Sequence, residues 1–393
     1  MVAAAGGAVS ARALPTAFTG DPMPPTLTTG AEGLDIRWPD GTSGTFPYLW
    51  LRDTDPAGFH PQTGERVFDL TRTPLDIAPE RVEVTADALL VTWPDSDAPS
   101  RFDLDWMRAH RPGRPRPDPA DIPARAWRAD LGAAGLPRHD AQALVTSDAA
   151  LAAWLADTRR LGLSLVTGLA DDVEAGMAVA RRVGHLRETN FGRMFEVVSK
   201  PDPNNLAYTA EALPLHTDLT NQELPPGWQF LHCLANAARG GGSIFCDGLA
   251  VAQDLRAEDP AAFELLSTVT VPFRFHDRDS DIRARKAVIT LGPDGAVSEI
   301  CFNAHLADIL DLAPGTLPAY YRAYRRFMAL TRDPAYGIAL RLSAGEMVVF
   351  DNRRVLHGRE AFDPSTGFRH LHGCYVDRGE WDSRLRVLAR APG

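Results

Sequence analysis

Short strand-like segments dominate the chain after residue 190 and constrain its fold more than any other feature. In these segments apolar residues alternate with polar ones or run on without interruption. Helical periodicity is confined to a few stretches, so strands and helices do not alternate as they do around a parallel sheet. One of these stretches is a helix that Ser147 can cap and that Gly162 ends. The pattern predicts a mainly β fold with flanking helices, built as an antiparallel barrel or jelly roll. The expected strands cover residues 195–199, 206–209, 214–219, 228–234, 243–246, 346–351 and 369–377.

The composition changes along the chain and divides it into four parts. Residues 1–28, rich in Ala, Gly and Pro, are expected to be a disordered tail. Residues 29–110 show short strand signals, among them 46–51, and predict a small N-terminal β-rich domain, the front module. Five prolines within 111–127 predict a stiff linker or a surface strap. Residues 128–393 would form the large, catalytic domain.

Composition and charge exclude several classes of partner. The 393 residues are 45% hydrophobic and 23% charged, with a formal net charge of −10. These values are typical of a soluble globular protein and argue against binding to nucleic acid. No apolar run reaches about 18 residues, so no membrane span is expected. The four cysteines are widely spaced and form no Cys-x-x-Cys pair, which indicates free thiols in a reducing, cytoplasmic compartment.

One short stretch, residues 215–218, has the pattern of a metal site. In an extended segment the side chains of His216 and Asp218 point to the same face, because strand side chains alternate. His357, far along the chain, could complete a set of two imidazoles and one carboxylate. Such a facial triad leaves coordination positions open and suits non-haem Fe(II) oxygenases.

The last expected strand, residues 369–377, carries an arginine on one face together with Tyr375. The guanidinium of Arg369 would be a permanently charged fork for a carboxylate. A metal with open positions and an inward arginine suit an α-keto diacid, whose keto acid end chelates the metal while its far carboxylate meets the arginine. His370 and His372, on the other face, are a rival metal set with the alternation of an ordinary strand.

A series of short motifs runs through most of the chain. They are Tyr48-Leu49-Trp50-Leu51-Arg52-Asp53, Val91-Thr92-Trp93-Pro94-Asp95, Asn204-Asn205-Leu206-Ala207-Tyr208-Thr209, Leu215-His216-Thr217-Asp218, Pro225-Pro226-Gly227, Gly240-Gly241-Gly242-Ser243, Asp351-Asn352-Arg353-Arg354-Val355-Leu356-His357-Gly358 and Arg369-His370-Leu371. Each motif alone is weakly specific, but their order is highly specific. Together they resemble the γ-butyrobetaine dioxygenase and trimethyllysine dioxygenase family of TauD-like oxygenases, which depend on Fe(II) and 2-oxoglutarate.

The resemblance implies that the core of the large domain is a double-stranded β-helix, a form of jelly roll. It also implies that Fe(II) is the cofactor and that 2-oxoglutarate and O2 are co-substrates. Members of this family are often dimers, so a homodimer is expected. The implied residues are His216, Asp218 and His357 for Fe(II), and Arg369, Leu231 and Ser243 for 2-oxoglutarate.

The resemblance further implies a cage of aromatic rings that binds a trimethylammonium group by cation–π attraction. Two of the rings are phenylalanines where the best-known butyrobetaine enzymes have tyrosine and tryptophan, which are stronger cation–π surfaces. Asn205 matches a residue that contacts the substrate carboxylate, but its companion asparagine is missing from the segment 302–305. Arg193 could bind an acid group or face solvent. The cage positions are Phe191, Phe195, Tyr208 and Tyr375.

A second departure from the family lies in the front module. Family members often hold a structural zinc with a cysteine cluster just after the Trp-Leu-Arg-Asp run. Here residues 54–60 contain no cysteine, and the later histidine of that site falls near Asp97. His60 alone cannot make a four-ligand site. The front module is therefore expected to fold without zinc.

These features predict an Fe(II)- and 2-oxoglutarate-dependent dioxygenase that hydroxylates a C–H bond of a small zwitterionic or quaternary-ammonium substrate. The same chemistry could act on trimethyllysine, an aminophosphonate or a natural-product intermediate. A hydrolase or isomerase with the same metal ligands is a rival that Arg369 argues against. A metal-free jelly-roll binding protein is another rival, and the presence of all three metal ligands argues against it.

Overall fold

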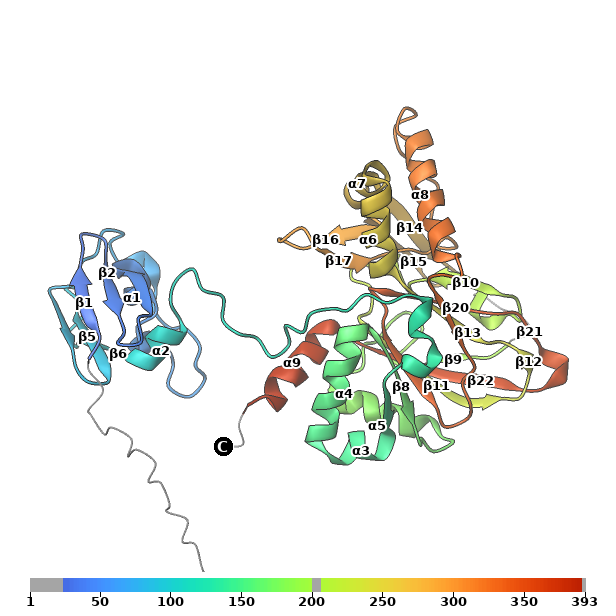
Figure 1. The fold of residues 1–393 in the computed structure, drawn as a ribbon, viewed down its shortest axis with the longest axis horizontal. Coiled ribbons are helices and arrows are strands. Elements are labelled where there is room, and N and C mark those ends of the chain that lie inside the picture. The colour runs from blue at the N-terminus through green and yellow to red at the C-terminus, as the bar shows by residue number, and fades with distance from the viewer. Residues whose placement is uncertain (1–23, 200–205, 391–393) are drawn as a thin grey trace, which may run out of the picture. The chain divides into compact units, whose positions relative to one another are not determined.

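The computed structural model describes residues 24–199 and 206–390, which form two compact units (Figure 1). The units divide between Pro117 and Asp118. Most of the expected N-terminal tail lies outside the described residues, but strand β1 begins at Thr26, inside the range expected for the tail. The predicted combination of many strands with flanking helices is confirmed.

The front module consists of two three-stranded antiparallel sheets and two short α-helices. The alternation at Leu34 and Ile36 places both side chains in its apolar core. The strand expected over residues 46–51 is wrong in its second half, because Tyr48 and Leu51, three residues apart, both face the core from a helix. The elements are β1 Thr26–Thr29, β2 Gly33–Arg37, β3 Ser43–Pro47, α1 Tyr48–Asp53, β4 Arg81–Val84, β5 Ala88–Thr92, β6 Ser100–Asp103 and α2 Leu104–Ala109.

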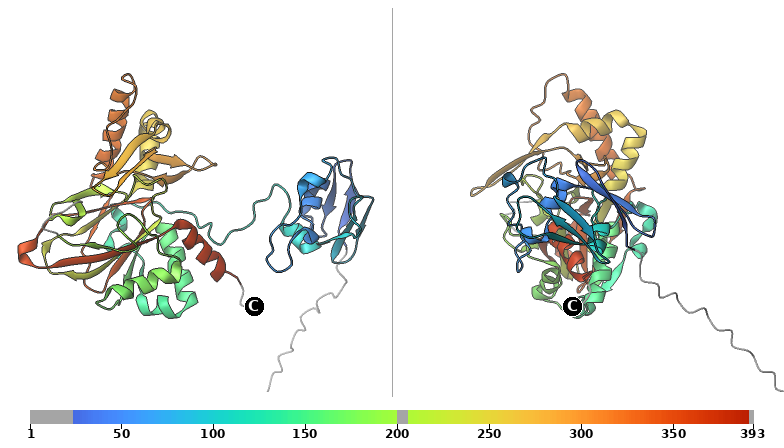
Figure 2. Two further views of the ribbon diagram at one scale, coloured as in Figure 1. Left: turned by 180° about the vertical axis from the view of Figure 1, so that it is seen from behind. Right: turned by 90° about the vertical axis from the view of Figure 1, so that its left-hand side faces the viewer.

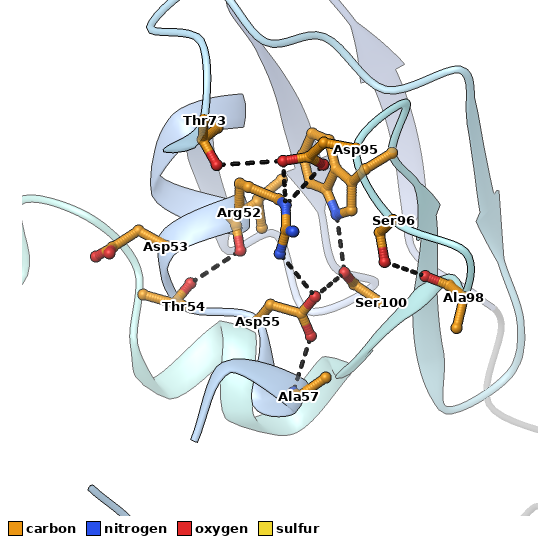
Figure 3. Close-up of polar contacts among 12 residues, drawn as sticks. Arg52, Asp53, Thr54, Asp55, Ala57, Thr73, Asp95, Ser96, Ala98 and Ser100 are labelled. Atoms are coloured by element: carbon orange, nitrogen blue, oxygen red, sulfur yellow. Dashed lines mark hydrogen bonds and ion pairs between the residues drawn. The ribbon is translucent and has the colours of Figure 1, made fainter. Parts of the chain in front are cut away.

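Hydrogen bonds join the two segments in which the resemblance places a zinc site (Figure 3). Asp55, which is 3% exposed, accepts a hydrogen bond from Ser100 Oγ. Ser100 Oγ in turn accepts one from Trp93 Nε1 at 2.8 Å. Close by, Arg52 Nε donates to Asp95 Oδ1 at 3.0 Å. Polar side chains therefore connect these segments directly.

The large unit is built on two sheets whose inner faces pack together. The six-stranded sheet has the order β7-β8-β19-β11-β22-β9, and the four-stranded sheet has the order β10-β20-β13-β18. Phe350 of the first sheet and Phe245 of the second share one apolar cluster, with ring centroids 5.5 Å apart. The strands are β7 Arg138–Asp140, β8 Leu163–Thr167, β9 Phe195–Val197, β10 Leu213–His216, β11 Trp228–Asn236, β13 Ser243–Asp247, β18 Gly337–Leu340, β19 Met347–Asp351, β20 Val355–Arg359 and β22 Arg369–Val376.

Four helices cover the outer face of the six-stranded sheet (Figures 1 and 2). Ser147 caps the helix predicted there, with its Oγ accepting a hydrogen bond from Ala150 N, and Gly162 ends it in a left-handed conformation. Trp381 stacks on Trp228 of the sheet at 4.0 Å between ring centroids. The helices are α3 Ala141–Thr146, α4 Asp148–Leu161, α5 Val173–Val183 and α9 Arg378–Leu388.

A second group of helices and hairpins packs around its own apolar cluster, which includes Phe263, Phe273 and Phe327. Hairpin β14-β15 of this group reaches the pocket described below. The elements are α6 Gly248–Glu258, α7 Pro260–Thr268, β14 Val271–His276, β15 Asp281–Lys286, β16 Ile289–Leu291, β17 Val297–Ile300 and α8 Leu317–Thr331, and a further short pair of strands is β12 Arg239–Gly240 with β21 Phe362–Asp363.

The second half of the expected linker belongs to the large unit, because residues 118–127 pack into it. Asp247, fully buried, accepts a hydrogen bond from Trp127 N at 3.0 Å. Arg354 donates hydrogen bonds to the same carboxylate from Nε at 3.0 Å and from Nη2 at 2.8 Å. It also donates a hydrogen bond of 2.7 Å from Nη2 to the carbonyl oxygen of Arg125. One buried ion pair thus fastens this segment to the sheets.

None of the helices among the described residues is long and apolar enough to cross a membrane. All four cysteines are buried and unpaired. Burial raises the pKa of Cys233 to about 11, so this thiol stays protonated and is a poor nucleophile at neutral pH.

Ser100→Ala tests the hydrogen bonds that join the zinc-site segments. The variant leaves the buried Trp93 indole N–H without its partner and removes one of the hydrogen bonds to the Asp55 carboxylate, so the front module should lose about 1–3 kcal/mol of unfolding free energy. Denaturant titration followed by tryptophan fluorescence would measure the loss. Ser96→Ala, at a half-buried serine that donates only to the carbonyl of Ala98, is the matched control.

The same titration with EDTA added to the wild-type protein tests the expectation that the front module folds without zinc. EDTA should not shift the unfolding transition of the front module, and a shift would contradict this expectation.

Candidate metal centre and its pocket

His216 and His357 meet because β10 and β20 pair in a fixed register. His216 lies directly opposite His357 in this antiparallel pair, and directly opposed side chains share a face. Their ring centroids are 4.3 Å apart. The ring of Phe350 packs 4.7 Å from that of His357. The two imidazoles therefore lie together on the inner face of the four-stranded sheet.

Asp218 lies just past the end of β10, because the strand expected over 214–219 ends at His216. Leu219 follows in a left-handed conformation with φ of 54°. Asp218 N donates to Asn352 Oδ1 at 2.6 Å, and Asn352 Nδ2 donates to Asp218 O at 3.1 Å. The fully buried amide of Asn352 replaces the strand partner and holds Asp218 beside the two histidines.

The ligand atoms of His216, Asp218 and His357 lie within 4.8 Å of one another. Asp218 Oδ1 is 3.1 Å from His216 Nε2, and Asp218 Oδ2 is 3.6 Å from His357 Nε2. His216 Nδ1 lies 2.8 Å from the carbonyl oxygen of Pro214. A proton donated there leaves the Nε2 lone pair for a metal. Within residues 24–199 and 206–390 this is the one such metal-ligating group.

The charges of the group also suit a divalent cation. Burial, and then the neighbouring His216, lower the pKa of His357 to about 3. Burial alone would raise the pKa of Asp218, but the interaction with His357 and the hydrogen bond with His216 lower it well below its usual range. At neutral pH His357 is neutral and Asp218 is ionised, which is the state a metal ion requires of its ligands. The residues therefore fit an iron ion.

Tyr375 supports this group from β22. Its hydroxyl donates a hydrogen bond of 2.7 Å to Asp218 Oδ2. Burial, and then the Asp218 carboxylate, raise the pKa of Tyr375 well above its usual value, so the hydroxyl keeps its proton. The ring of Tyr375 stacks on that of Phe195 with centroids 5.0 Å apart. One side chain thus links the metal ligands to an aromatic wall.

A pocket of about 350 Å³ opens onto this group and brings together residues from both sheets and from hairpin β14-β15. Asn205 lies outside the described residues, and Arg193 is exposed and does not line the pocket. Tyr208 reaches the pocket from a 3-10 helix, Leu206–Tyr208, so the strand expected there is wrong. Ten predicted site residues line the pocket, namely His216, Asp218, His357, Arg369, Leu231, Ser243, Phe191, Phe195, Tyr208 and Tyr375.

The expected alternation along β22 is confirmed. Arg369, Leu371 and Tyr375 line the pocket, whereas Cys374 and Val376 belong to the cluster under the outer helices. The rival metal pair lies on that outer face as well. His370 Nε2 is 3.3 Å from Glu196 Oε1, and neither His370 nor His372 lines the pocket. The rival pair is therefore no part of this site.

Arg369 extends into the pocket without an acidic partner. It is 5% exposed, its Nε has no hydrogen-bond partner, and no carboxylate of the described residues pairs with it. Burial, and then Arg359, lower the pKa of Arg369 to about 10, so it is still cationic at neutral pH. A buried cation without a counter-charge is unfavourable. The pocket is therefore suited to an anionic ligand.

Sequence reasoning missed several residues of the wall. Arg359 could have been found, because it lies two residues after His357 on the same strand face. Gln229 could have been found in the same way, because it lies two residues before Leu231 on β11. The remaining residues come from hairpin β14-β15 and the turn at His305, and no local pattern brings these segments to the pocket. The missed residues are Arg359, Gln229, Arg274, Phe275, His276 and His305.

Tyr375→Phe removes the hydroxyl that holds Asp218 and keeps the ring. Loss of such an outer contact typically weakens metal binding about 10- to 100-fold, and we expect a loss in this range for Mn(II), measured by calorimetric titration of the apoprotein. Tyr320→Phe is the matched control, because Tyr320 is fully buried and its hydroxyl has no hydrogen-bond partner among the described residues. Equal affinities of the two variants would contradict the role of Tyr375.

Comparison with known proteins agrees with this geometry. Residues 123–375 match the family described as taurine catabolism dioxygenase TauD, TfdA family. Residues 26–108 match gamma-butyrobetaine hydroxylase-like, N-terminal. Gamma-butyrobetaine dioxygenase of Pseudomonas sp. (strain AK-1) is 43% identical over 366 residues, covering 92% of this chain and 94% of the relative. Mitochondrial trimethyllysine dioxygenase of Gallus gallus is 30% identical over 368 residues, covering 91% and 86%.

Among solved structures, a putative alpha-ketoglutarate dependent 2,4-D dioxygenase from Burkholderia xenovorans matches with a TM-score of 0.48 and 18% identity, covering 62% of this chain and 94% of that one. The sequence matches extend over both units, and the metal-ligating group lies inside the matched range. They confirm the resemblance drawn from the motifs. The chain therefore belongs to the TauD, TfdA dioxygenase family and is an Fe(II)- and 2-oxoglutarate-dependent dioxygenase.

Proposed function

We propose that this dioxygenase hydroxylates a C–H bond of a small zwitterionic quaternary-ammonium molecule, as the γ-butyrobetaine dioxygenases do. The observation that carries the proposal is one pocket with three parts: the metal-ligating group, the unpaired Arg369 and a wall of aromatic rings. The two facing sheets, antiparallel apart from the β7–β8 pair, support a double-stranded β-helix, or jelly roll, as the core that carries these parts.

In this proposal His216, Asp218 and His357 hold the iron. When bound, Fe(II) would activate O2, and 2-oxoglutarate would be oxidised to succinate and CO2. The chain itself supplies ligands in the right state of protonation and orientation. Pro214 fixes the tautomer of His216. Asn352 fixes the backbone of Asp218, and this fixed geometry spares the site from reorganising during the reaction.

Arg369 would bind the far carboxylate of 2-oxoglutarate. Its planar guanidinium can form two parallel hydrogen bonds to one carboxylate, and burial strengthens them. Leu231 and Ser243 line the same pocket and are both nearly buried, at 9% and 8% exposed. They would give the co-substrate an apolar wall and a hydroxyl. The missing acidic partner of Arg369 among the described residues supports this assignment.

Four rings of the wall would face the onium group. Phe195 stacks on Tyr375, and Phe191 packs on Phe275 with centroids 5.3 Å apart. Gly373 leaves room for Phe195, because a Cβ at that position would overlap the phenylalanine ring. Tyr208 supplies the fourth ring. Each ring in contact with a cation contributes about 0.5–2 kcal/mol, so the wall would select an onium group over a neutral one.

A homodimer and a cytoplasmic location complete the proposal. The four buried, unpaired thiols support a reducing compartment. The dimer rests on the family resemblance, and light scattering of the purified protein would test it.

Succinate release with a panel of small molecules tests the proposed function. We expect γ-butyrobetaine to stimulate release, and its neutral tert-butyl analogue to do so about tenfold less well or worse, because the analogue lacks the charge that the rings attract. Trimethyllysine, aminophosphonates and other amino acids belong in the panel as the alternative substrates. Release that depends on an aminophosphonate and not on any onium compound would contradict the proposal.

Arg369→Lys tests the co-substrate site. Lysine keeps the positive charge, but it lacks the planar guanidinium that can donate two parallel hydrogen bonds to one carboxylate. The KM for 2-oxoglutarate should therefore rise about tenfold or more, measured by succinate release at saturating primary substrate. Arg193→Lys is the matched control, because Arg193 is exposed and lies outside the pocket. A KM for 2-oxoglutarate that is the same in both variants would argue against the assignment of Arg369.

A further inference from the structure

A second pocket, of about 510 Å³, lies in the unit that contains the front module, and the proposed function does not use it. Its walls come from the sheet β1-β2-β3 and from the segment that follows α2. All of its lining residues precede Pro117, so the pocket belongs entirely to this compact unit. The first half of the expected linker therefore forms part of a pocket wall.

The register of the sheet gathers polar side chains at this pocket. Leu34 and Ile36 of β2 point into the apolar core, so Arg37 points to the opposite face. Thr26 of β1 and Ser43 of β3 lie directly opposite Arg37 on its two sides. Directly opposed side chains share a face. One row of the sheet thus presents a guanidinium between two hydroxyl groups.

A tight turn brings two more arginines to the same place. Residues 111–114 read Arg-Pro-Gly-Arg, and Arg114 N donates a hydrogen bond of 3.2 Å to Arg111 O. Proline at the second position and glycine with a φ of 73° at the third are the pattern of a type II turn. The two ends of such a turn lie close together, so Arg111 and Arg114 both line the pocket.

Contacts with the sheet hold this turn in place. Arg108 of α2 forms an ion pair with Asp40 in the connection between β2 and β3. Arg111 Nη1 donates to the carbonyl oxygen of Ser43 at 3.2 Å. Gly44 leaves room for this approach, because a Cβ at that position would lie 2.8 Å from Arg111 Cγ. The arginine is therefore positioned before any ligand binds, which favours affinity.

The guanidinium groups of the pocket have no acidic partner. Arg37, Arg111 and Arg114 form no ion pair with a carboxylate of the described residues, and Arg111 Nε is buried without a hydrogen-bond partner. Other arginines of this unit do pair with carboxylates, namely Arg52, Arg66, Arg72, Arg81, Arg101 and Arg108. The unpaired positive charge is thus concentrated at one pocket, where it attracts anions.

The remaining lining residues narrow the class of anion. Asp35 is the one acidic residue among the described lining residues, and its Oδ1 accepts a hydrogen bond of 2.6 Å from Thr45 Oγ1. Three guanidinium forks offer more donors than the two oxygens of one carboxylate can accept, whereas a phosphate group presents three acceptor oxygens. No aromatic ring is among the described lining residues, so the wall offers no surface on which a base could stack.

We propose that this pocket binds the diphosphate group of a small molecule through Arg37, Arg111 and Arg114. Two linked phosphate units supply oxygens to all three guanidinium groups, and Arg37 and Arg114 are exposed, so the ligand can enter from solvent. The diphosphate group is recognised whether it is free or attached to a nucleoside. The unit with the front module then has a binding role of its own, separate from the metal centre.

Calorimetric titration of the full-length protein with inorganic diphosphate tests the proposal. No divalent metal is added, because diphosphate chelates it, and the ionic strength is held constant. Wild type should bind the anion, and Arg111→Ala should weaken binding about tenfold or more, the effect of losing a hydrogen bond to a charged group. Arg111→Lys should fall between the two, because it keeps the charge without the fork.

Two further variants separate a shaped site from a general effect of charge. Gly44→Ala keeps every charge but displaces Arg111, so it should also weaken binding. Arg116→Ala is the matched control, because Arg116 is exposed, forms no ion pair with a described carboxylate and lies outside the pocket. It should keep the wild-type affinity. Denaturant titration identifies any variant that fails to fold, and Arg114→Ala, at an exposed residue, then replaces Arg111→Ala with the same expected loss.

The outcomes decide the proposal without reference to succinate release, so they are independent of the proposed function. Citrate should bind clearly more weakly than diphosphate, and ADP should bind about as tightly as diphosphate. Citrate that binds equally well overturns the phosphate class, and ADP that binds more than about tenfold more tightly overturns recognition by the diphosphate group alone. The proposal is also overturned by no binding to wild type, by unchanged binding in the folded arginine variants, or by an equal loss in Arg116→Ala.

Discussion

The site depends on the register of β20, which is held between β10 and β13. In this register His357 lies opposite His216 on one neighbour and Phe245 on the other. A slip by one residue would turn every side chain of β20 to the opposite face. Leu356, now part of the apolar cluster around α6 and α8, would enter the pocket, and His357 would be buried among apolar side chains.

Buried arginines at the two ends of β20 help to fix that register. Arg354 precedes the strand core and binds Asp247 together with backbone carbonyls of residues 125 and 160. Arg359 ends the strand and binds carbonyls of residues 207–211. Both would lose all these partners in another register, and an unpaired buried cation is costly. The ion pair at Asp247 therefore positions the metal ligands without touching them.

Amide and hydroxyl side chains hold the parts of the site that leave the regular sheets. Asn352 holds Asp218, and Asn303 with Thr217 holds the turn at His305. Irregular segments must satisfy their buried backbone groups in this way, because they have no strand partner. The result is a set of functional loops on a rigid scaffold, in which Tyr375 joins the metal ligands to the aromatic wall.

The sequence by itself determined the features that depend on local pattern. Alternation predicted that Arg369 and Tyr375 share a face, and the serine and glycine signals predicted the ends of α4. Ordered motifs identified the family, and with it His216, Asp218 and His357. These inferences succeed because the side-chain direction in a strand and the caps of a helix are set by neighbours in the chain.

The tertiary structure decided what depends on distant partners. It ended β10 before Asp218, because Asn352 offers a better partner than a continued strand. It made residues 206–208 a 3-10 helix and residues 48–53 an α-helix. It also brought hairpin β14-β15 and His305 to the pocket. No local pattern encodes the end of β10 or the place of the hairpin and His305, since these follow from groups far apart in sequence that must pair once they are buried together.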